Sequence, residues 1–329
     1  MLSPNKNFQG LLFIVALFIS APSHAKIVEH AHLKEKLQQA ACQQEKWTTE
    51  KLWKIGFTKT QVAMGTVSFK GALNLQKLRV FIEKKAHHKS HNAFTFGRCP
   101  NKTAWYATFP SPMRVTQSAQ RIEFHLKGMN KYCRSAAVYF ASQNGGRARK
   151  LATTKFKPAP TSLIINTAFL PAGSLSFNCR PRTKTISTVL WELIPVHDAG
   201  HTKLPFDHLL KETNTAIALT TWINAVRREN LMAPLKPTQS MVRDTLLKNP
   251  TINHFKSNVD KAAKILKRKG KRFIGENRVI GDNHEDMAWM LWNSPSHRSL
   301  LLNTNATHFD VGTRPLGQET LAIIMLEAH

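Results

Sequence analysis

Apolar residues in the first part of the chain recur at mixed three- and four-residue steps. The recurring positions are Ile27, Val28, Leu33, Leu37, Ala41, Leu52, Trp53 and Ile55. Steps of this size place side chains on one side of a helix. The pattern therefore predicts an amphipathic helical segment over residues 26–63.

From residue 64 to about residue 200, the pattern changes to short alternating or continuous apolar runs. The runs cover residues 67–69, 78–82, 122–126, 137–140, 163–165 and 189–193. Turn-forming clusters at residues 110–112, 144–146 and 171–173 separate several of them. Short strands separated in this way are typical of an antiparallel β-sandwich, which we expect over residues 64–200. The histidine-rich stretch at residues 87–91 has lysine neighbours and is expected to be an exposed loop.

Longer helical patterns return after a linker near residues 195–205. Leu219, Ile223 and Val226 follow a four-three spacing, which predicts a helix with an apolar inward face. Further helices are expected around residues 241–247, 257–270 and 283–292, and alternating residues at 309–313 and 321–325 predict a terminal hairpin. The chain as a whole is predicted to be α+β.

The first 25 residues are organised like a secretory signal peptide. Lys6 precedes an apolar core at residues 11–19, and Ser23-His24-Ala25 provides a small-x-small cleavage site. The apolar core is too short to span a bilayer, and no later segment approaches the roughly 20 apolar residues that a spanning helix needs. We predict a secreted or periplasmic protein, with a retained N-terminal anchor as the alternative.

All four cysteines lie before residue 200, three of them in the predicted sandwich: they are Cys42, Cys99, Cys133 and Cys179. In an oxidising compartment this even count predicts up to two disulfides, and four cysteines allow three pairings. No Cys-x-x-Cys spacing suggests a structural zinc site.

The chain is strongly basic, with 47 Lys and Arg against 20 Asp and Glu, a formal charge of +27 and a pI near 10.3. Such a charge attracts polyanions, and lipopolysaccharide, teichoic acid, glycans and nucleic acid are candidate partners. The densest basic run covers residues 261–272, and no aromatic residue interrupts it before Phe273. A solvated helix face is the favoured explanation of the run, and a stacking platform for single-stranded nucleic acid is missing.

Residues that can carry chemistry are concentrated near the C-terminus. They lie in Gly275-Glu276-Asn277-Arg278 and in Trp292-Asn293-Ser294-Pro295-Ser296-His297-Arg298, with Asn224-Ala225-Val226-Arg227 and an isolated His254 upstream. The order and spacing of these residues resemble the CAP superfamily in its bacterial secreted form. The resemblance covers about residues 209–329 and implies an α-β-α sandwich following the helical segment and the β-sandwich.

The resemblance implies that His254 and His297 are the two histidines of the family's tetrad and that Glu276 faces the same cavity. The second acid of the tetrad should fall at Ser294 or Pro295, and neither residue can replace it. The remaining set, two imidazoles and one carboxylate, suits a divalent ion such as zinc with a vacant water position.

Structural roles compete with these assignments. A lone histidine such as His254 is often a surface or hydrogen-bonded residue, and Glu276 could be a capping or salt-bridged carboxylate near the lysine run. Asn277 can brace a loop. Ser294 before Pro295 suits the N-cap of a helix.

Two further positions concern the framework of the domain. Asn224 and Arg227 match the family's Asn-x-x-Arg element, and Arg227 is expected to donate to carbonyls or a carboxylate. Asp310 stands where the family has the first glycine of its Gly-x-Gly strand, so the strand edge is expected to differ locally.

The function expected first is a secreted binding or interaction module whose cleft holds a divalent metal or a small ligand. One alternative is a metal-dependent hydrolase of envelope or host material, with Glu276 as general base. Another is a polyanion-binding surface protein. No activated serine or cysteine nucleophile is evident, so an enzyme is less expected than a binding protein.

Overall fold

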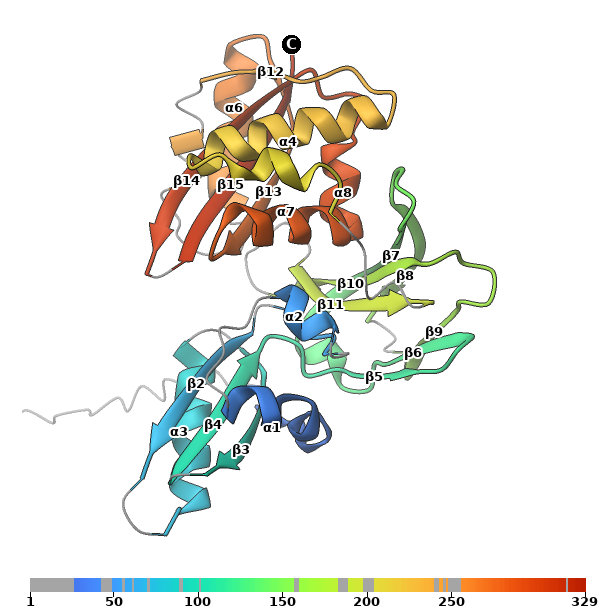
Figure 1. The fold of residues 1–329 in the computed structure, drawn as a ribbon. Coiled ribbons are helices and arrows are strands. Elements are labelled where there is room, and N and C mark those ends of the chain that lie inside the picture. The colour runs from blue at the N-terminus through green and yellow to red at the C-terminus, as the bar shows by residue number, and fades with distance from the viewer. Residues whose placement is uncertain are drawn as a thin grey trace, which may run out of the picture.

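The computed structural model describes residues 27–42, 49–54, 57–60, 62–69, 72–88, 91–100, 102–156, 160–182, 189–197, 204–239, 243–244, 247, 256–317 and 319–329. They form the mixture of helices and sheets predicted by the α+β class, arranged in three units along the chain (Figure 1). The predicted signal peptide, residues 1–25, and His254 lie outside the described residues. Within the described ranges, no helix has both the length and the apolar character needed to cross a bilayer.

The N-terminal unit, residues 27–109, is a four-stranded sheet with a helix on each face. Its elements are β1 (Val28–Glu29), a 3-10 turn (Ala31–Leu33), α1 (Lys34–Cys42), α2 (Thr49–Lys54), β2 (Ala63–Ser68), α3 (Leu75–His88), β3 (Ala93–Cys99) and β4 (Thr103–Phe109). The strand order is β1-β3-β4-β2, with β1 parallel to β3 and the other pairs antiparallel. Leu33 and Leu37 pack with Trp105 on one face, and Leu78 and Ile82 pack with Phe94 on the other.

The strand predicted at residues 78–82 is wrong, because this segment lies within α3. Leu78, Ile82 and Ala86 are buried at four-residue steps, whereas Val80 is 61% exposed. The apolar Val80 on the outer face made a helical spacing look like alternation. The exposed loop expected at residues 87–91 is also wrong at His91, which is buried with its Nδ1 2.9 Å from the Thr108 hydroxyl.

The sandwich unit, residues 111–197, contains two antiparallel sheets with strand orders β11-β10-β7-β8 and β5-β6-β9. Its elements are β5 (Arg114–Gln117), β6 (Arg121–His125), a 3-10 turn (Met129–Lys131), β7 (Cys133–Ser142), β8 (Arg149–Lys155), β9 (Ser162–Asn166), β10 (Gly173–Pro181) and β11 (Val189–Val196). One apolar core joins the sheets, with the rings of Phe124 and Phe177 5.1 Å apart. The strands predicted at residues 122–126, 137–140, 163–165 and 189–193 match β6, β7, β9 and β11.

A buried ion pair connects the N-terminal unit to the sandwich unit. The Lys59 ammonium lies 2.6 Å from Glu192 Oε1 and also donates to the Met113 carbonyl. The Ser111 hydroxyl donates to the same carboxylate oxygen at 2.5 Å, and the Thr58 hydroxyl donates to Oε2 at 2.8 Å. Both oxygens of a fully buried carboxylate are therefore hydrogen-bonded, as a stable buried charge requires.

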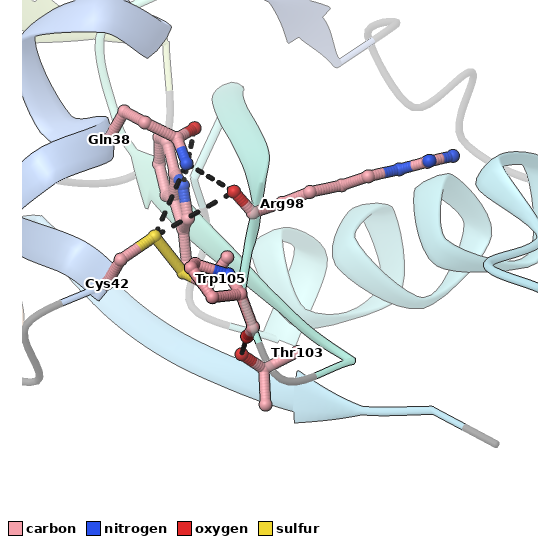
Figure 2. The surroundings of a disulfide bond; sticks show 7 residues. Gln38, Cys42, Arg98, Thr103 and Trp105 are labelled. Atoms are coloured by element: carbon pink, nitrogen blue, oxygen red, sulfur yellow. Dashed lines mark hydrogen bonds between the residues drawn. A yellow bond between two sulfur atoms is a disulfide. The ribbon is translucent and has the colours of Figure 1, made fainter.

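The four cysteines form two disulfides, Cys42–Cys99 and Cys133–Cys179. The first joins the end of α1 to the end of β3, where the Gln38 side chain donates to Cys42 Sγ and to the Arg98 carbonyl (Figure 2). The second joins neighbouring strands β7 and β10 inside the sandwich. Cys42 and Cys99 are half-buried, whereas Cys133 and Cys179 are fully buried.

This difference in burial predicts the order of reduction. In the folded protein, a mild thiol reductant should open Cys42–Cys99 at least about tenfold faster than Cys133–Cys179, because exchange requires access to a sulfur atom. Alkylation of the released thiols followed by peptide mass spectrometry measures both rates. Under denaturant, which exposes both bonds, the difference should vanish; equal rates in the folded protein would contradict the prediction.

The C-terminal unit, residues 204–329, is a four-stranded sheet of order β12-β14-β15-β13. Its elements are a 3-10 turn (Asp207–Lys211), α4 (Thr215–Glu229), β12 (Lys236–Pro237), α6 (Lys256–Arg268), β13 (Arg272–Gly281), α7 (His284–Asn293), α8 (Pro295–Leu301), β14 (His308–Leu316) and β15 (Glu319–Ala328). Leu321, Ile323 and Met325 of β15 share a buried cluster with α6. The alternate residues Ile324 and Leu326 share the core formed with α4 and α7.

Candidate functional site

The Gly-Glu-Asn-Arg run lies on β13, and its neighbours show which element it approaches. A Cβ added to Gly275 would come within 2.9 Å of Leu300 in α8, so this position needs the close approach that glycine allows. The Asn277 side chain donates to the His297 carbonyl at 3.1 Å. The two motif segments, residues 275–278 and 292–298, therefore meet where β13 passes α8.

Glu276 forms a buried ion pair with Arg278, two residues along the same strand. The distance from Arg278 Nε to Glu276 Oε1 is 3.2 Å, and the side chains are 0% and 3% exposed, respectively. Glu276 is paired with Met325 in the register, so it lies on the face of the sheet that α6 covers. Glu276 is thus salt-bridged, but its partner is Arg278 and not a residue of the lysine run. The two-residue period of a strand could have indicated this partner, because residues two positions apart lie on the same face.

His297 lies in the first turn of α8 and is half-buried. Ser294 occupies the N-cap position and Pro295 the first helical position, as expected, but the Ser294 side chain makes no capping hydrogen bond. Its hydroxyl instead lies 3.3 Å from the Ser296 hydroxyl. Ser294 is completely buried at the place where the resemblance expects the second acid.

Asn224 and Arg227 of α4 hold the framework around this region. Arg227 is buried and donates from Nε to the Ala233 carbonyl at 3.0 Å, and from Nη1 to the carbonyls of Leu301 at 2.7 Å and Asn303 at 3.1 Å. Asn224 exchanges two hydrogen bonds with the backbone of Leu235. Burial, followed by the charge of Arg147, lowers the pKa of Arg227. The expected carbonyl contacts of Arg227 are present, and they fix the end of α8.

Arg298, next to His297, reaches out of the C-terminal unit into the sandwich unit. Its Nε donates to the Trp292 carbonyl and its Nη1 to the Ser142 carbonyl of β7, both at 2.6 Å. The guanidinium also stacks 3.8 Å from the centre of a Trp292 ring. Burial lowers the pKa of Arg298 to about 9, which keeps the group charged at neutral pH. The arginine therefore connects the two units directly beside the candidate histidine.

A polar stripe on β10 forms the rest of this contact. The Ser174 hydroxyl donates to the Asn293 carbonyl at 2.6 Å, and the Asn178 amide donates to the Ser296 hydroxyl at 2.9 Å. Leu175 and Phe177, which alternate with them, face the sandwich core instead. The sandwich thus holds residues on both sides of His297. Sequence reasoning missed these contacts because polar residues on alternate strand positions are equally typical of a solvent-facing surface.

An apolar contact completes the junction between the units. Trp53 of α2 meets Trp289 of α7 edge to face, with ring centres 5.3 Å apart. Helix α2 contacts both α7 and β11, and Figure 1 shows it below α7. Leu190 and Leu193 of β11 belong to the same buried cluster as the core of the C-terminal unit. Trp289 and Trp292 are both buried, in agreement with a packing role.

Asp310 is accommodated by an ion pair rather than by a change in the strand. Its Oδ1 lies 3.2 Å from Nη1 of Arg243, and β14 pairs with β15 without a register shift. The Arg243 side chain passes over Gly312, where an added Cβ would come within 2.2 Å of it. The strand therefore keeps a regular register at Asp310, and a local difference from the family at this edge stays a prediction.

The proposed metal ligands are of donor types that a divalent ion accepts. Glu276 and His297 provide a carboxylate and an imidazole, which zinc accepts, and His254 would provide the second imidazole. In the part of the chain that the structure describes, no three His, Cys, Asp or Glu side chains form a group that could hold a metal. His254 precedes the start of α6 by two residues and is outside that part. The donor types fit zinc, and Arg278 is a competing cation at the carboxylate.

Comparison with protein-family models gives no match, and neither does comparison with curated proteins. Among solved structures, a cysteine-rich secretory protein from Staphylococcus aureus subsp. aureus Mu50 is similar at 11% identity and a TM-score of 0.28, covering 65% of this chain and 82% of that one. An extracellular protein containing a SCP domain from Bacillus anthracis str. Ames is similar at 12% identity and a TM-score of 0.26, covering 66% and 68%. TM-scores this low do not by themselves establish a shared fold.

Proposed function

We propose that residues 209–329 form a CAP-type α-β-α unit that serves as the binding module of a secreted protein. The observation that carries the proposal is the meeting of β13 and α8, where Asn277 donates to the His297 carbonyl. The Arg227 contacts to the end of α8 support it, because they fix the helix that carries His297. Two disulfides fit an oxidising compartment.

The ligand proposed for this module is a divalent metal ion, or a small ligand of similar chemistry, held by His254, Glu276 and His297. Ser296 is engaged with Asn178, and Ser294 lies beside Ser296 in the same contact. These contacts disfavour either hydroxyl as a nucleophile. Binding rather than turnover is therefore the function we propose.

Calorimetric titration with zinc tests the proposal on the chain from residue 26 onward. The sandwich must be retained, because Leu190 and Leu193 share the core of the C-terminal unit. One zinc ion should bind per chain, and His297→Ala or His254→Ala should each weaken binding by about 100-fold or more. The exposed His208 provides the control, since His208→Ala should leave the affinity unchanged.

Equal affinities for wild type and both histidine variants would contradict the assignment, as would wild-type protein that binds no zinc. Circular dichroism of each variant separates loss of a ligand from loss of the fold.

A further inference from the structure

The outward face of α6 carries a group of cations that packing does not explain. Ala262 and Leu266 of this helix are buried against β15. The opposite face exposes four basic side chains, which we call the α6 cationic face: Lys261, Lys264, Lys267 and Arg268. Lys267 and Arg268 lie in the last turn, where a positive charge interacts favourably with the negative end of the helix dipole. Lys261 and Lys264 lie in the middle of the helix, so the dipole does not account for them.

These charges are not neutralised within the described residues. Some exposed arginines of the N-terminal and sandwich units do have carboxylate partners: Arg79 pairs with Glu29 and Arg121 with Glu123, each at 2.7 Å. No ion pair involving the α6 cationic face occurs in the described ranges, and Asp260 is the one acidic residue on α6. A helix face that is merely solvated usually mixes charges of both signs at three- and four-residue spacing. On this face Asp260 is the one acidic residue among four basic ones, so positive charge is in clear excess.

The cations also surround a hollow in the surface. An open depression is lined by Asp260, Lys261, Lys264, Ile265 and Arg268. Residues 261, 264 and 268 are spaced by three and four, so they lie on one side of the helix. They extend over about 10 Å along its axis. This arrangement suits several anionic groups on one ligand better than a single small anion.

We propose that the α6 cationic face binds the phosphate groups repeated along an anionic envelope polymer. Lysine and arginine side chains are the usual donors to phosphate oxygens. Nucleic acid is disfavoured, because single-strand binding relies on exposed aromatic rings and α6 carries none. Phe273, the first aromatic residue after the helix, is packed with Ala262 and Leu266. The proposal does not require a ligand at Glu276 and His297.

The test compares two variants with the same change in net charge. In the α6 variant, Lys261, Lys264, Lys267 and Arg268 are each replaced by glutamine. In the control variant, four exposed lysines of the other units are replaced in the same way: Lys77, Lys84, Lys85 and Lys127. Binding of the full chain to polyglycerol-phosphate teichoic acid and to vesicles containing phosphatidylglycerol is measured over a range of salt concentrations. A single-stranded oligonucleotide serves as the third probe.

Wild-type protein should bind the teichoic acid more tightly than the vesicles, because the polymer repeats its phosphates along one chain. The α6 variant should bind at least about tenfold more weakly, and the slope of log affinity against log salt should fall by about 3. The control variant should stay within about twofold of wild type.

Three outcomes would overturn the proposal. They are equal losses in the two variants, which would assign binding to overall charge; no binding of wild type to the teichoic acid; and preferential binding of the vesicles or the oligonucleotide. Unchanged circular dichroism of both variants ensures that a loss of binding is not a loss of folding.

Discussion

Replacement of Glu192 by alanine is expected to lower the free energy of unfolding by roughly 3–5 kcal/mol, because it leaves a buried cation without its counter-charge. Lys59 and Glu192 are 3% and 0% exposed, so water cannot take the place of the carboxylate. The hydroxyls of Thr58 and Ser111 would lose their acceptor at the same time. The junction between the N-terminal and sandwich units therefore depends on this one carboxylate.

The stability deficit of Glu192→Ala, which is its loss in free energy of unfolding relative to wild type, should also depend on pH. Burial lowers the pKa of Lys59 in the wild type, while Glu192 opposes the shift. Removing Glu192 lowers the folded-state pKa further below the unfolded value. When the folded-state pKa of a lysine is depressed, the unfolded chain binds the proton more readily than the folded one. The free energy of unfolding is therefore highest above the unfolded-state pKa and falls as the pH falls. The deficit should thus shrink as the pH rises toward about 10.

Denaturant unfolding of three proteins measures this effect: wild type, Glu192→Ala and the double variant Lys59→Met with Glu192→Leu. The double variant should be more stable than Glu192→Ala, since it removes both charges and keeps apolar volume in the site. A loss below about 1 kcal/mol in Glu192→Ala, or a deficit that grows with pH, would contradict the account.

Replacement of Arg298 by alanine has the second large expected effect. It should lower the free energy of unfolding by about 3 kcal/mol. It removes two charge-assisted hydrogen bonds, to the carbonyls of Trp292 and Ser142, and the stacking on Trp292. Part of this loss is offset, because the desolvation of a buried guanidinium is also relieved. Arg298→Lys should recover little, because one ammonium cannot reproduce a planar fork between two carbonyls.

The exposed Arg228 of α4 supplies the matched control, and Arg228→Ala should change stability by less than about 0.5 kcal/mol. A second readout reports on the contact between the units. Arg147 donates to the Leu302 carbonyl at 2.7 Å in the intact contact, so trypsin should cleave after Arg147 faster in Arg298→Ala than in the control. Similar stability and cleavage for the two variants would exclude a role of Arg298 in joining the units.

The fold could be predicted where one pattern had one explanation. The sandwich strands alternate regularly, and turn residues separate them, so their positions follow from local spacing. In α3, Val80 lies on the exposed face between the buried Leu78 and Ile82. The apolar Val80 on the exposed face made the four-residue repeat of a helix look like the alternation of a strand. Local spacing alone could not distinguish these two patterns.

The site shows the same division between local and long-range information. Asn277 as a brace, Arg227 as a donor to carbonyls and Ser294 at an N-cap position follow from residue type and spacing. The contacts of Ser296 and Arg298 with the sandwich join residues more than 100 positions apart. Such contacts depend on how separate units pack, and neither periodicity nor a motif contains that information.

The packing of the sandwich against the turn that carries His297 has a consequence for binding. Ser296 and Arg298 are both held by the sandwich, and Asn277 holds the His297 carbonyl from β13. The backbone of His297 is therefore fixed from two units before any ligand arrives. A preorganised backbone lowers the entropic cost of placing a ligand group.

Zinc-edge anomalous diffraction from crystals of the chain grown with zinc tests the central proposal most directly. The account predicts an anomalous peak about 2.0–2.2 Å from an imidazole nitrogen of His297 and a carboxylate oxygen of Glu276. His254 should complete the ligand set. Zinc peaks confined to other histidines, or no peak beside His297, would contradict the proposal that β13 and α8 meet to form a metal site.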